Sequence, residues 1–536
     1  MSEFDENRLN DELLALKGEE AARAWQLCHS LDLELEACQR QGNSAKLTLE
    51  VILPWLKEYL SCDEVALKLF VSKKEELYIP EPSIAPRLGT LLEEERVGEF
   101  EKGTLACVSL EVLDETVAYL AASFSIAPPS PGAAVLLKIA AQEMDNLLYE
   151  FRRARLRHEQ VMEIERRLTD PILSKTIDST ADFVLSESGA IGLVVAFQED
   201  TLNLGDGMRC SVHFSDGRVE RYSGGDGSEL GERLQNGKGS PDDIAISAGL
   251  KGVSAVRVDV ETGLSSRGAQ GFVIASADSK SWDDASRELL QHFAIALGQR
   301  LVDYHKEQRY LSQFFSPGVC SRLLSSSAYQ MEYLLPRLRD VAILFSDITS
   351  FTCISEQILD GPEEVGELVD YWSQGVVEIL YKYGGTFDKM VGDCVIGLFG
   401  PPFDERALAN CCEDALNCAL DINRYTAELR GIDSIEKIVR SDLIPGLGVA
   451  TGVHCGAAMV GAMGPNRDFT AFGREMNNTA RLQGIASFRE ILVMEEVKKV
   501  LFDNGSPLAE KIQWGEVSSE AVKNVKDPLR FYRISL

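Results

Sequence analysis

The chain has 536 residues, of which 84 are acidic and 54 basic, so its formal net charge is −30. Because nucleic acids and anionic membrane surfaces bind positive protein faces, this charge argues against both as partners. No run approaches the roughly 20 apolar residues that span a bilayer, and the acidic, polar start at Met1–Asn10 is unlike a signal peptide. We therefore expect a cytoplasmic protein without membrane insertion.

The first 150 residues are predicted to form an N-terminal helix, residues 1–45, followed by a mixed α/β unit over residues 46–150. Residues 8–60 have helical apolar spacing and no interior proline before Pro54. The pattern then changes to short β-rich runs, closed by a helix from Ala133. These runs are Val65–Val71, Thr104–Leu110 and Thr116–Ser125.

Residues 171–304 repeat this order, which predicts a second α/β unit. Its predicted elements are a helix over Pro171–Glu187, strands over Ala190–Phe197, Cys210–Phe214, Val253–Val260 and Gly271–Ala277, and a helix over Trp282–Tyr304. Between the units, Glu143–Leu168 contains neither glycine nor proline, so we expect a continuous helix there, with residues 151–170 as the connector.

The two units resemble tandem GAF domains, the small-molecule sensing modules that often precede a signalling enzyme. The resemblance implies a possible small-molecule ligand. However, the Asn-Lys-Phe-Asp-Glu motif of cyclic-nucleotide-binding GAF domains is not recognisable in either unit. Two dimerisation domains without a ligand are the alternative interpretation.

A second helical connection is predicted over Glu307–Leu324, broken at Pro317. We assign residues 305–338 to this linker, which resembles the segment before many bacterial cyclase domains. A pair of such helices could carry a rotation or a register change between the upstream units and the C-terminal domain.

Residues 339–536 alternate between predicted strands and helices. The predicted elements are a strand over Val341–Phe345, a helix over Glu363–Tyr383, and a hairpin of Thr386–Met390 and Cys394–Phe399. Asp347 follows the first strand, and Asp393 lies in the hairpin turn. Carboxylates on adjacent strands could hold two Mg²⁺ ions, although a single aspartate more often caps a turn.

Four motifs in order resemble those of class III nucleotide cyclases. Phe345–Thr352 resembles the metal-binding segment Phe-Ala-Asp-Ile-x-Gly-Phe-Thr, with Ser346 and Ser350 in place of Ala and Gly. The others are Gly384–Asp393, which resembles the Gly-Gly…Asp-Lys-x-x-Gly-Asp hairpin; Gly448–Gly456 with Val460–Gly464, which resemble a glycine-rich strand pair; and Asp468–Leu482, which resembles Asp-Tyr-Thr…Gly…Val-Asn-x-Ala-Ala-Arg-Leu. The resemblance implies a ferredoxin-like, βαββαβ-type adenylyl cyclase domain.

The resemblance also implies a role for each matching residue. Asp347, Ile348 and Asp393 would bind two Mg²⁺ or Mn²⁺ ions per site; the backbone of Thr349, Ser350, Phe351 and Thr352 would face the triphosphate of ATP; Lys389 and Thr470 would read the base; Asn477 would orient the ribose; and Arg481 would stabilise the transition state. Asn477 and Arg481 are one helical turn apart and share a face.

Hydrogen-bond chemistry favours adenine over guanine at this pair. Lys389 offers only donors, which suits the unprotonated N1 of adenine and opposes the N1–H of guanine, and Thr470 can accept from the adenine amine. A guanylyl cyclase is expected to carry an acidic residue near Lys389, and we expect none here. The Lys/Thr pair also resembles the adenine-reading pair of one adenylyl cyclase subgroup.

In this family the two halves of the site come from different protomers, so the resemblance implies a homodimer with active sites at the protomer interface. The predicted function is conversion of ATP to 3′,5′-cyclic AMP and pyrophosphate, regulated by the upstream units. The alternatives are a guanylyl cyclase, and a non-catalytic sensor or scaffold with a degenerate cyclase domain. The complete residue set argues against degeneracy.

Overall fold

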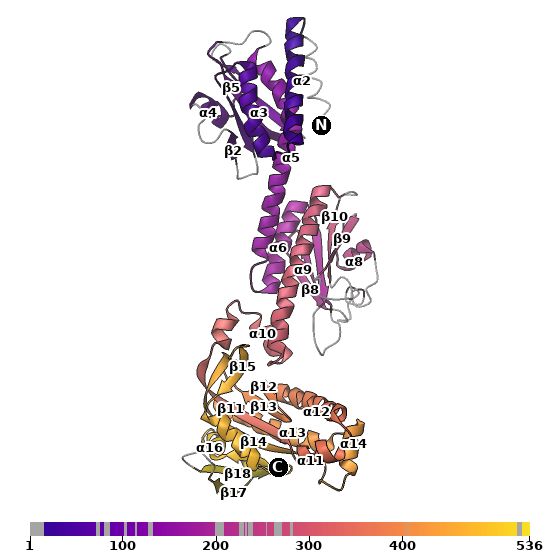
Figure 1. Cartoon of the computed structure of the whole chain (residues 1–536), viewed down its shortest axis with the longest axis vertical. Coiled ribbons are helices and arrows are strands. Elements are labelled where there is room, and N and C mark those ends of the chain that lie inside the picture. Colours follow the sequence, from indigo (N-terminus) through magenta and orange to yellow (C-terminus); the bar gives the residue numbers. More distant parts are fainter. Residues whose placement is uncertain are drawn as a thin grey trace.

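A computed structural model describes residues 16–535, except 71–75, 80–85, 101–103, 113–114, 127–131, 199–207, 224–229, 231–232, 234–239, 253, 262–270, 279–281, 404 and 522–527. The chain forms three bodies in sequence order along one long axis (Figure 1). The first fifteen residues of the predicted N-terminal helix, and the ends of the strands predicted at Val71 and Val253, lie outside the described residues.

The first unit is a five-stranded antiparallel sheet between helices, with strand order β2-β1-β5-β4-β3. Its elements are α2 (Glu19–Arg40), α3 (Ala45–Leu60), β1 (Glu64–Phe70), β2 (Glu76–Ile79), α4 (Pro86–Glu93), β3 (Gly98–Phe100), β4 (Leu105–Val112), β5 (Glu115–Ser123) and α5 (Ala133–Arg167). The helical run before β1 is two helices, because the chain turns at Gly42, whose φ is +70°.

The second unit has a sheet of the same size, with order β8-β7-β6-β10-β9. Its elements are α6 (Leu173–Ser188), β6 (Gly192–Gln198), β7 (Met208–Phe214), β8 (Val219–Ser223), α8 (Pro241–Ser247), β9 (Ser254–Val260), β10 (Gly271–Ala277) and α9 (Asp284–Ser312). In both sheets the first strand pairs with the last. Two α/β units are thus present, as predicted, and their assignment as GAF domains stays a prediction.

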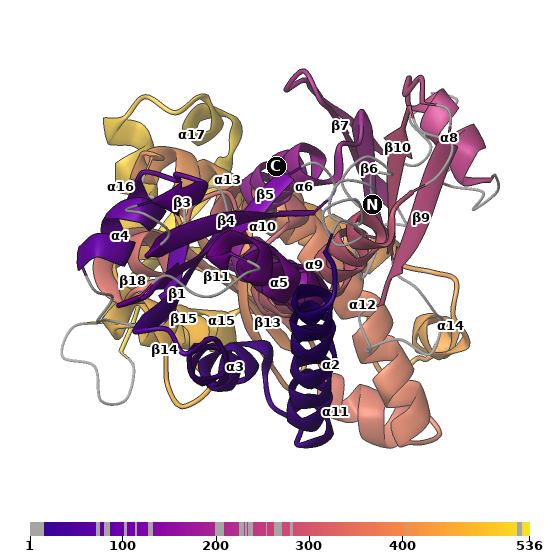
Figure 2. The same ribbon diagram turned by 90° about the horizontal axis from the view of Figure 1, so that it is seen from above.

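Two long helices join the bodies. The connector predicted over residues 151–170 is the second half of α5, which already begins in the first unit at Ala133. Helix α9 continues to Ser312, past the boundary predicted at Tyr304, because its apolar face stays buried as far as Leu311. Seen along the long axis, α5 and α9 lie near the centre, with the sheets of the two units to either side (Figure 2). In the described residues, no helix combines the length and apolarity needed to cross a membrane.

The linker turns after α9 and continues as α10 (Pro317–Leu323) and a short π-helix over Gln330–Leu334. Pro317 is the first residue of α10, where its missing N–H costs no intrahelical hydrogen bond. The predicted break at Pro317 is therefore the start of a new helix.

The C-terminal domain contains an eight-stranded sheet that begins at Arg337, two residues before the predicted boundary. Its elements are β11 (Arg337–Ile348), α11 (Phe351–Cys353), a π-helix (Ile354–Ile358), α12 (Pro362–Lys382), β12 (Gly385–Val391), β13 (Cys394–Phe399), α13 (Leu408–Glu428), α14 (Asp433–Arg440), β14 (Val449–Met463), β15 (Asp468–Phe472), α15 (Arg474–Ile485), β16 (Ile491–Met494), α16 (Glu495–Asp503), α17 (Pro507–Lys511), β17 (Gln513–Glu520) and β18 (Leu529–Ser535).

The first four strands of this sheet follow the predicted βαββαβ order. The sheet order is β12-β13-β11-β14, and each neighbouring pair is antiparallel. The predicted glycine-rich strand pair is one continuous strand, β14, because residues 457–460 keep pairing with the start of β11 instead of turning.

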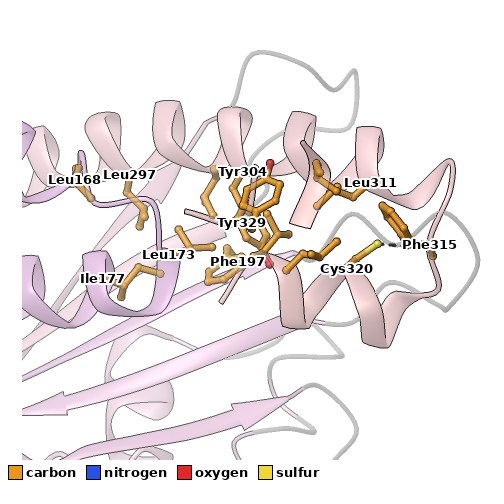
Figure 3. Packing of buried hydrophobic residues seen from close by; sticks show 14 of the residues in the cluster. Leu168, Leu173, Ile177, Phe197, Leu297, Tyr304, Leu311, Phe315, Cys320 and Tyr329 are labelled. Atoms are coloured by element: carbon orange, nitrogen blue, oxygen red, sulfur yellow. Dashed lines mark hydrogen bonds between the residues drawn. The ribbon is translucent and has the colours of Figure 1, made fainter. Parts of the chain in front are cut away.

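Alternate residues of β11 face two different cores. Ala342 and Leu344 pack toward the helices α12 and α13, whereas Ile343 and Phe345 face the side covered by the linker. The linker-side cluster is continuous from Ile177 and Leu297 of the second unit through Leu311 and Phe315 to the C-terminal sheet. Figure 3 shows this packing along α9 and into α10. The same apolar core therefore joins the second unit to the C-terminal domain.

Candidate active site

Two carboxyl groups meet where β11 ends and the β12–β13 hairpin turns. Asp347 is paired with Cys394 in the sheet, and Asp393 precedes Cys394 in the turn. Burial, followed by the neighbouring Asp347 carboxyl group, raises the pKa of Asp393 to about 7. Asp393 Oδ2 is buried and has no hydrogen-bond partner among the described residues. In the part of the chain that the structure describes, these two crowded carboxyl groups form no ion pair with a basic side chain.

This arrangement fits divalent cations. Carboxylate and main-chain carbonyl oxygens are ligands that Mg²⁺ and Mn²⁺ accept, and an ion would remove the repulsion between Asp347 and Asp393. Gln483 of α15 donates from Nε2 to Asp347 Oδ2 at 3.2 Å and so fixes this carboxylate. No cluster of three or more His, Cys, Asp or Glu side chains suited to a metal occurs in the described residues. The candidate metal site thus has two acidic side chains.

The segment after Asp347 was predicted to face a triphosphate with four backbone amides. Thr349 does not fit this prediction, because both its amide N–H and its hydroxyl donate to the Gly448 carbonyl, at 2.9 Å and 3.0 Å. Ser350 has a φ of +60° and precedes the short helix α11, which begins at Phe351. The turn after Asp347 is therefore anchored to β14 through Thr349.

Lys389 and Thr470 meet, as their predicted shared role requires. Lys389 Nζ donates to Thr470 Oγ1 at 3.0 Å, which joins the middle of β12 to β15. The Thr470 residue is 3% exposed, whereas the Lys389 side chain is 46% exposed. Lys389 thus retains donors that can reach a ligand, and Thr470 fixes where its ammonium group lies.

Asp388, beside this pair, corrects one expectation from the sequence. We expected no acidic group near Lys389, but the Asp388 carboxylate lies 3.8 Å from Lys389 Nζ. A β-bulge between Phe387 and Lys389 interrupts the regular alternation of side chains along the strand. As a result the Asp388 side chain is fully buried, with no exposed surface, behind Lys389.

Asn477 and Arg481 lie on α15, which packs directly against β14. A Cβ at Gly452 of β14 would approach the amide nitrogen of Gln483 to 2.8 Å, so only glycine allows this close contact. Asn477 is exposed and Arg481 half-buried. Neither side chain forms a hydrogen bond or ion pair with another described residue. Both are free to bind a ligand or a second protomer.

The comparisons with known proteins identify the family of the C-terminal domain. Residues 335–535 match the family model of the adenylate and guanylate cyclase catalytic domain. The C-terminal domain is a class III nucleotide cyclase catalytic domain. The matched residues span all the strands from β11 to β18 and all of the site residues described above.

Curated relatives match only part of the chain. Adenylate cyclase type 10 of rabbit (Oryctolagus cuniculus) is 22% identical over 160 residues, and that of rat (Rattus norvegicus) is 23% identical over 161 residues. Each match covers 29% of this chain and 9% of the relative. The chain therefore spans about a tenth of the length of these relatives.

Solved cyclase structures also match part of the chain. The adenylyl cyclase CyaB from P. aeruginosa is 26% identical, with a TM-score of 0.33, and the match covers 38% of this chain and 96% of that one. The guanylyl cyclase Cya2 is 22% identical, with a TM-score of 0.32, over 37% of this chain and 93% of its own. Adenylyl and guanylyl cyclases thus both occur among the similar structures.

Two polar residues of the cyclase domain were missed from the sequence. Asp388 stood inside the quoted Asp-Lys motif, but strand alternation gave no reason to place it beside the Lys389 ammonium group. Gln483 lies two residues after Arg481, on a different face of α15. Its contact with Asp347 depends on the packing of α15 on β14, which the sequence pattern does not define.

Proposed function

We propose that the chain is an adenylyl cyclase that converts ATP to 3′,5′-cyclic AMP and pyrophosphate. The observation that carries the proposal is the hydrogen bond from Lys389 to Thr470 within a class III cyclase domain. An ammonium group can only donate, so it suits N1 of adenine and opposes N1–H of guanine. The guanylyl cyclase alternative is less favoured, because Asp388, the acidic side chain that contacts Lys389 among the described residues, is fully buried.

The candidate metal residues would prepare the substrate for in-line attack. When bound by Asp347, Asp393 and the main chain of Ile348, two Mg²⁺ or Mn²⁺ ions would neutralise the triphosphate and acidify the ribose 3′-hydroxyl. Asp347 is held by Gln483, so its orientation is set before substrate binds. Ser350, Phe351 and Thr352 remain candidates to offer backbone amides to phosphate oxygens, whereas the Thr349 amide is engaged by Gly448.

Asn477 and Arg481 complete the proposed chemistry. The 3′-oxygen bonds to the α-phosphorus while the bond to pyrophosphate breaks, and negative charge grows on the phosphoryl oxygens. Arg481 would donate its planar guanidinium group to these oxygens, and Asn477 would orient the ribose. Both lack partners among the described residues, which is consistent with their use in a site completed by a second protomer.

We therefore propose a homodimer with two shared sites. One protomer would supply Asp347 and Asp393, and the other Lys389, Thr470, Asn477 and Arg481. Mixing inactive Asp347→Ala and Arg481→Ala proteins should restore about a quarter of wild-type activity, because half of the dimers are mixed and each mixed dimer has one intact site. Absence of rescue, with subunit exchange verified by differently tagged protomers, would contradict shared sites.

Regulation by the upstream units is proposed to act through the linker. The Phe387 amide N–H donates to the Phe314 carbonyl at 2.9 Å, two residues before Lys389. The rings of Phe315 and Phe469 are 4.9 Å apart, and Phe469 precedes Thr470. A movement of α9 therefore has a direct mechanical route to both base-reading strands. The upstream units would act as GAF-like sensors, with or without a small-molecule ligand.

The test is product formation by the purified full-length chain, given ATP or GTP with Mg²⁺ or Mn²⁺. We expect cyclic AMP from ATP, with metal required, and little cyclic GMP. Cyclic GMP as the main product would support the guanylyl cyclase alternative. No product with either nucleotide would support the scaffold alternative.

A further inference from the structure

Helix α15 carries functional side chains on two different faces. Asn477 and Arg481 share one face, and neither forms a hydrogen bond or ion pair with another described residue. Gln483 is rotated by about 200° from Arg481 around the helix, and its Nε2 donates to Asp347 Oδ2 at 3.2 Å. In the proposed homodimer the first face serves the site that the partner's metal residues complete, whereas Gln483 contacts a metal residue of its own protomer. One helix therefore touches both sites of the dimer.

The last turn of α15 is held closely against the sheet. A Cβ at Gly452 of β14 would lie 2.8 Å from the Gln483 amide nitrogen and 2.9 Å from the Thr479 carbonyl oxygen, so only glycine allows this contact. Gly452 pairs with Phe345 of β11, two residues before Asp347. The Gln483 side chain thus reaches Asp347 from a backbone that has little room to move independently of β11 and β14.

The hydrogen bond from Gln483 is compatible with a filled metal site. An ionised carboxylate has about four lone-pair positions, and Gln483 uses one of them. Asp347 can therefore bind a cation and accept from Gln483 at the same time. A carboxylate held by a cation is less free to rotate, and the hydrogen bond passes this restraint to the last turn of α15.

We infer that Gln483 is a positioning residue that couples the two active sites of the dimer. The inference rests on the proposed cyclase function with shared sites, and it adds a form of regulation to that function. Filling the metal half of one site restrains α15 of the same protomer, and α15 presents Asn477 and Arg481 to the other site. The first site to be filled therefore improves the alignment of Arg481 in the second, which is a positive coupling.

A mixed dimer with one working site isolates this effect. In full-length dimers purified through two different tags, an Arg481→Ala protomer supplies Asp347 to the working site, and an intact protomer supplies Arg481. Gln483 of the intact protomer contacts only the Asp347 of the inactive site. Gln483→Met in that protomer keeps the length of the side chain and removes the donor, so it reaches the working site through α15. We expect kcat to fall about fivefold, the lower end of typical couplings between sites.

The matched control is Gln513→Met in the same intact protomer. Gln513 is an exposed glutamine of β17 and should leave kcat unchanged. A fall in kcat of the same size in the control would show that the effect does not depend on the contact with Asp347, and would overturn the inference.

A double-mutant cycle separates coupling from a general disturbance of the helix. Asp347→Ala in the intact protomer removes the acceptor of the same hydrogen bond and should lower kcat of the working site by a similar factor. In the complementation experiment described above, communicating sites would therefore restore less than the quarter expected for independent sites. Gln483→Met and Asp347→Ala together should do no more than either alone. Effects that multiply would overturn the inference, because Gln483→Met would then act on α15 without Asp347.

Hydrogen exchange provides a readout that requires no turnover. Mn²⁺ alone should slow exchange of the backbone amides of α15, Arg474–Ile485, in the wild-type protein. It should not slow them in the Gln483→Met homodimer, where the link from Asp347 to the helix is absent. Equal slowing in both proteins would contradict the coupling.

The outcomes distinguish this inference from the proposed function. A wild-type protein that makes no cyclic nucleotide overturns the proposed function and the inference with it. If Asp347→Ala in the intact protomer abolishes turnover instead of lowering it about fivefold, the sites are not shared, and the inference also fails. If turnover survives and neither Asp347→Ala nor Gln483→Met changes kcat, the sites are shared but independent, and only the inference is overturned.

Discussion

Strand β12 and the turn that follows it carry acidic side chains in two contrasting environments. At the turn that follows the strand, Asp393 crowds against Asp347, and one of its oxygens has no partner among the described residues. In the middle of the same strand, Asp388 is buried beside Lys389 and Thr470. The first environment has no opposite charge of its own, whereas the second already contains both signs of charge. Under the proposed function, cations would complete the first half of the site on substrate binding, and the proposed base-reading half is already built into the fold.

The largest expected effect on activity comes from replacing the two carboxylates of the candidate metal site. Asp347→Ala and Asp393→Ala should each lower kcat by about 10²- to 10³-fold, because each loses a metal ligand worth several kcal/mol in the transition state. Steady-state assays over a range of Mn²⁺ concentrations measure this loss. Asp503→Ala, an exposed aspartate at the end of α16, is the control and should retain activity. Full activity of Asp393→Ala would refute its role as a ligand.

Arg481→Ala should have the next largest effect. It should reduce kcat about 10²-fold and change nucleotide affinity little. The guanidinium group is assigned to charge that grows only in the transition state, so the ground state should bind normally. Lysine should replace it poorly, because it lacks the planar fork. Steady-state kinetics measure kcat, and binding of a non-hydrolysable ATP analogue measures nucleotide affinity separately. Arg440→Ala, on the exposed side of α14, serves as control. Weaker binding at unchanged kcat would assign Arg481 to substrate capture instead.

Breaking the contact between the linker and the base-reading strands should have a smaller effect on activity. Phe315 and Phe469 are each 1% exposed and pack edge to face, so Phe315→Ala should destabilise the domain by about 3–5 kcal/mol. Activity should fall together with stability, and Phe315→Leu, which keeps most of the volume, should recover both. Thermal unfolding and cyclase assays on the same samples measure the two effects. Unchanged activity in a folded Phe315→Ala protein would contradict the proposed route of regulation.

The smallest effect is a loss of stability in acid. Burial lowers the pKa of His213 and of His454 to about 4, well below the usual 6.5. Because the unfolded chain binds these protons more readily, this contribution is complete above about pH 6.5 and decreases as the pH falls toward 4, by about 2–3 kcal/mol per histidine. Urea unfolding at pH 7.5 and 5 measures the decrease. His454→Gln should flatten the dependence in the cyclase domain, and an unchanged slope would show that His454 does not contribute.

Sequence patterns predicted the cyclase domain well, because four motifs occur in order and strand alternation is strong there. Lys389 and Thr470, which the motifs assigned to one shared role, are in contact, and the role itself stays a prediction. The Thr349 amide was wrongly assigned to phosphate, since its partner, the Gly448 carbonyl, is 99 residues away in the chain. Asp388 was overlooked because a β-bulge, which no composition rule reveals, buries it.

Helix boundaries were less predictable than helix existence. The helix predicted to end at Tyr304 continues to Ser312, because the linker-side core buries the next two turns of α9 as well. Likewise, the glycines of β14 suggested a turn, but pairing with β11 carries the strand through Gly456. In both places a contact with a distant segment determines the length of the element.

The central claim is that this site reads adenine. The most direct measurement is a competition assay in which the full-length protein receives equal concentrations of ATP and GTP with Mn²⁺ in one reaction. The ratio of cyclic AMP to cyclic GMP formed at early times equals the ratio of the two kcat/KM values. We predict a large excess of cyclic AMP from the wild-type protein. The Asp347→Ala protein should form little of either product. Equal amounts of the two products, or an excess of cyclic GMP, would contradict the account.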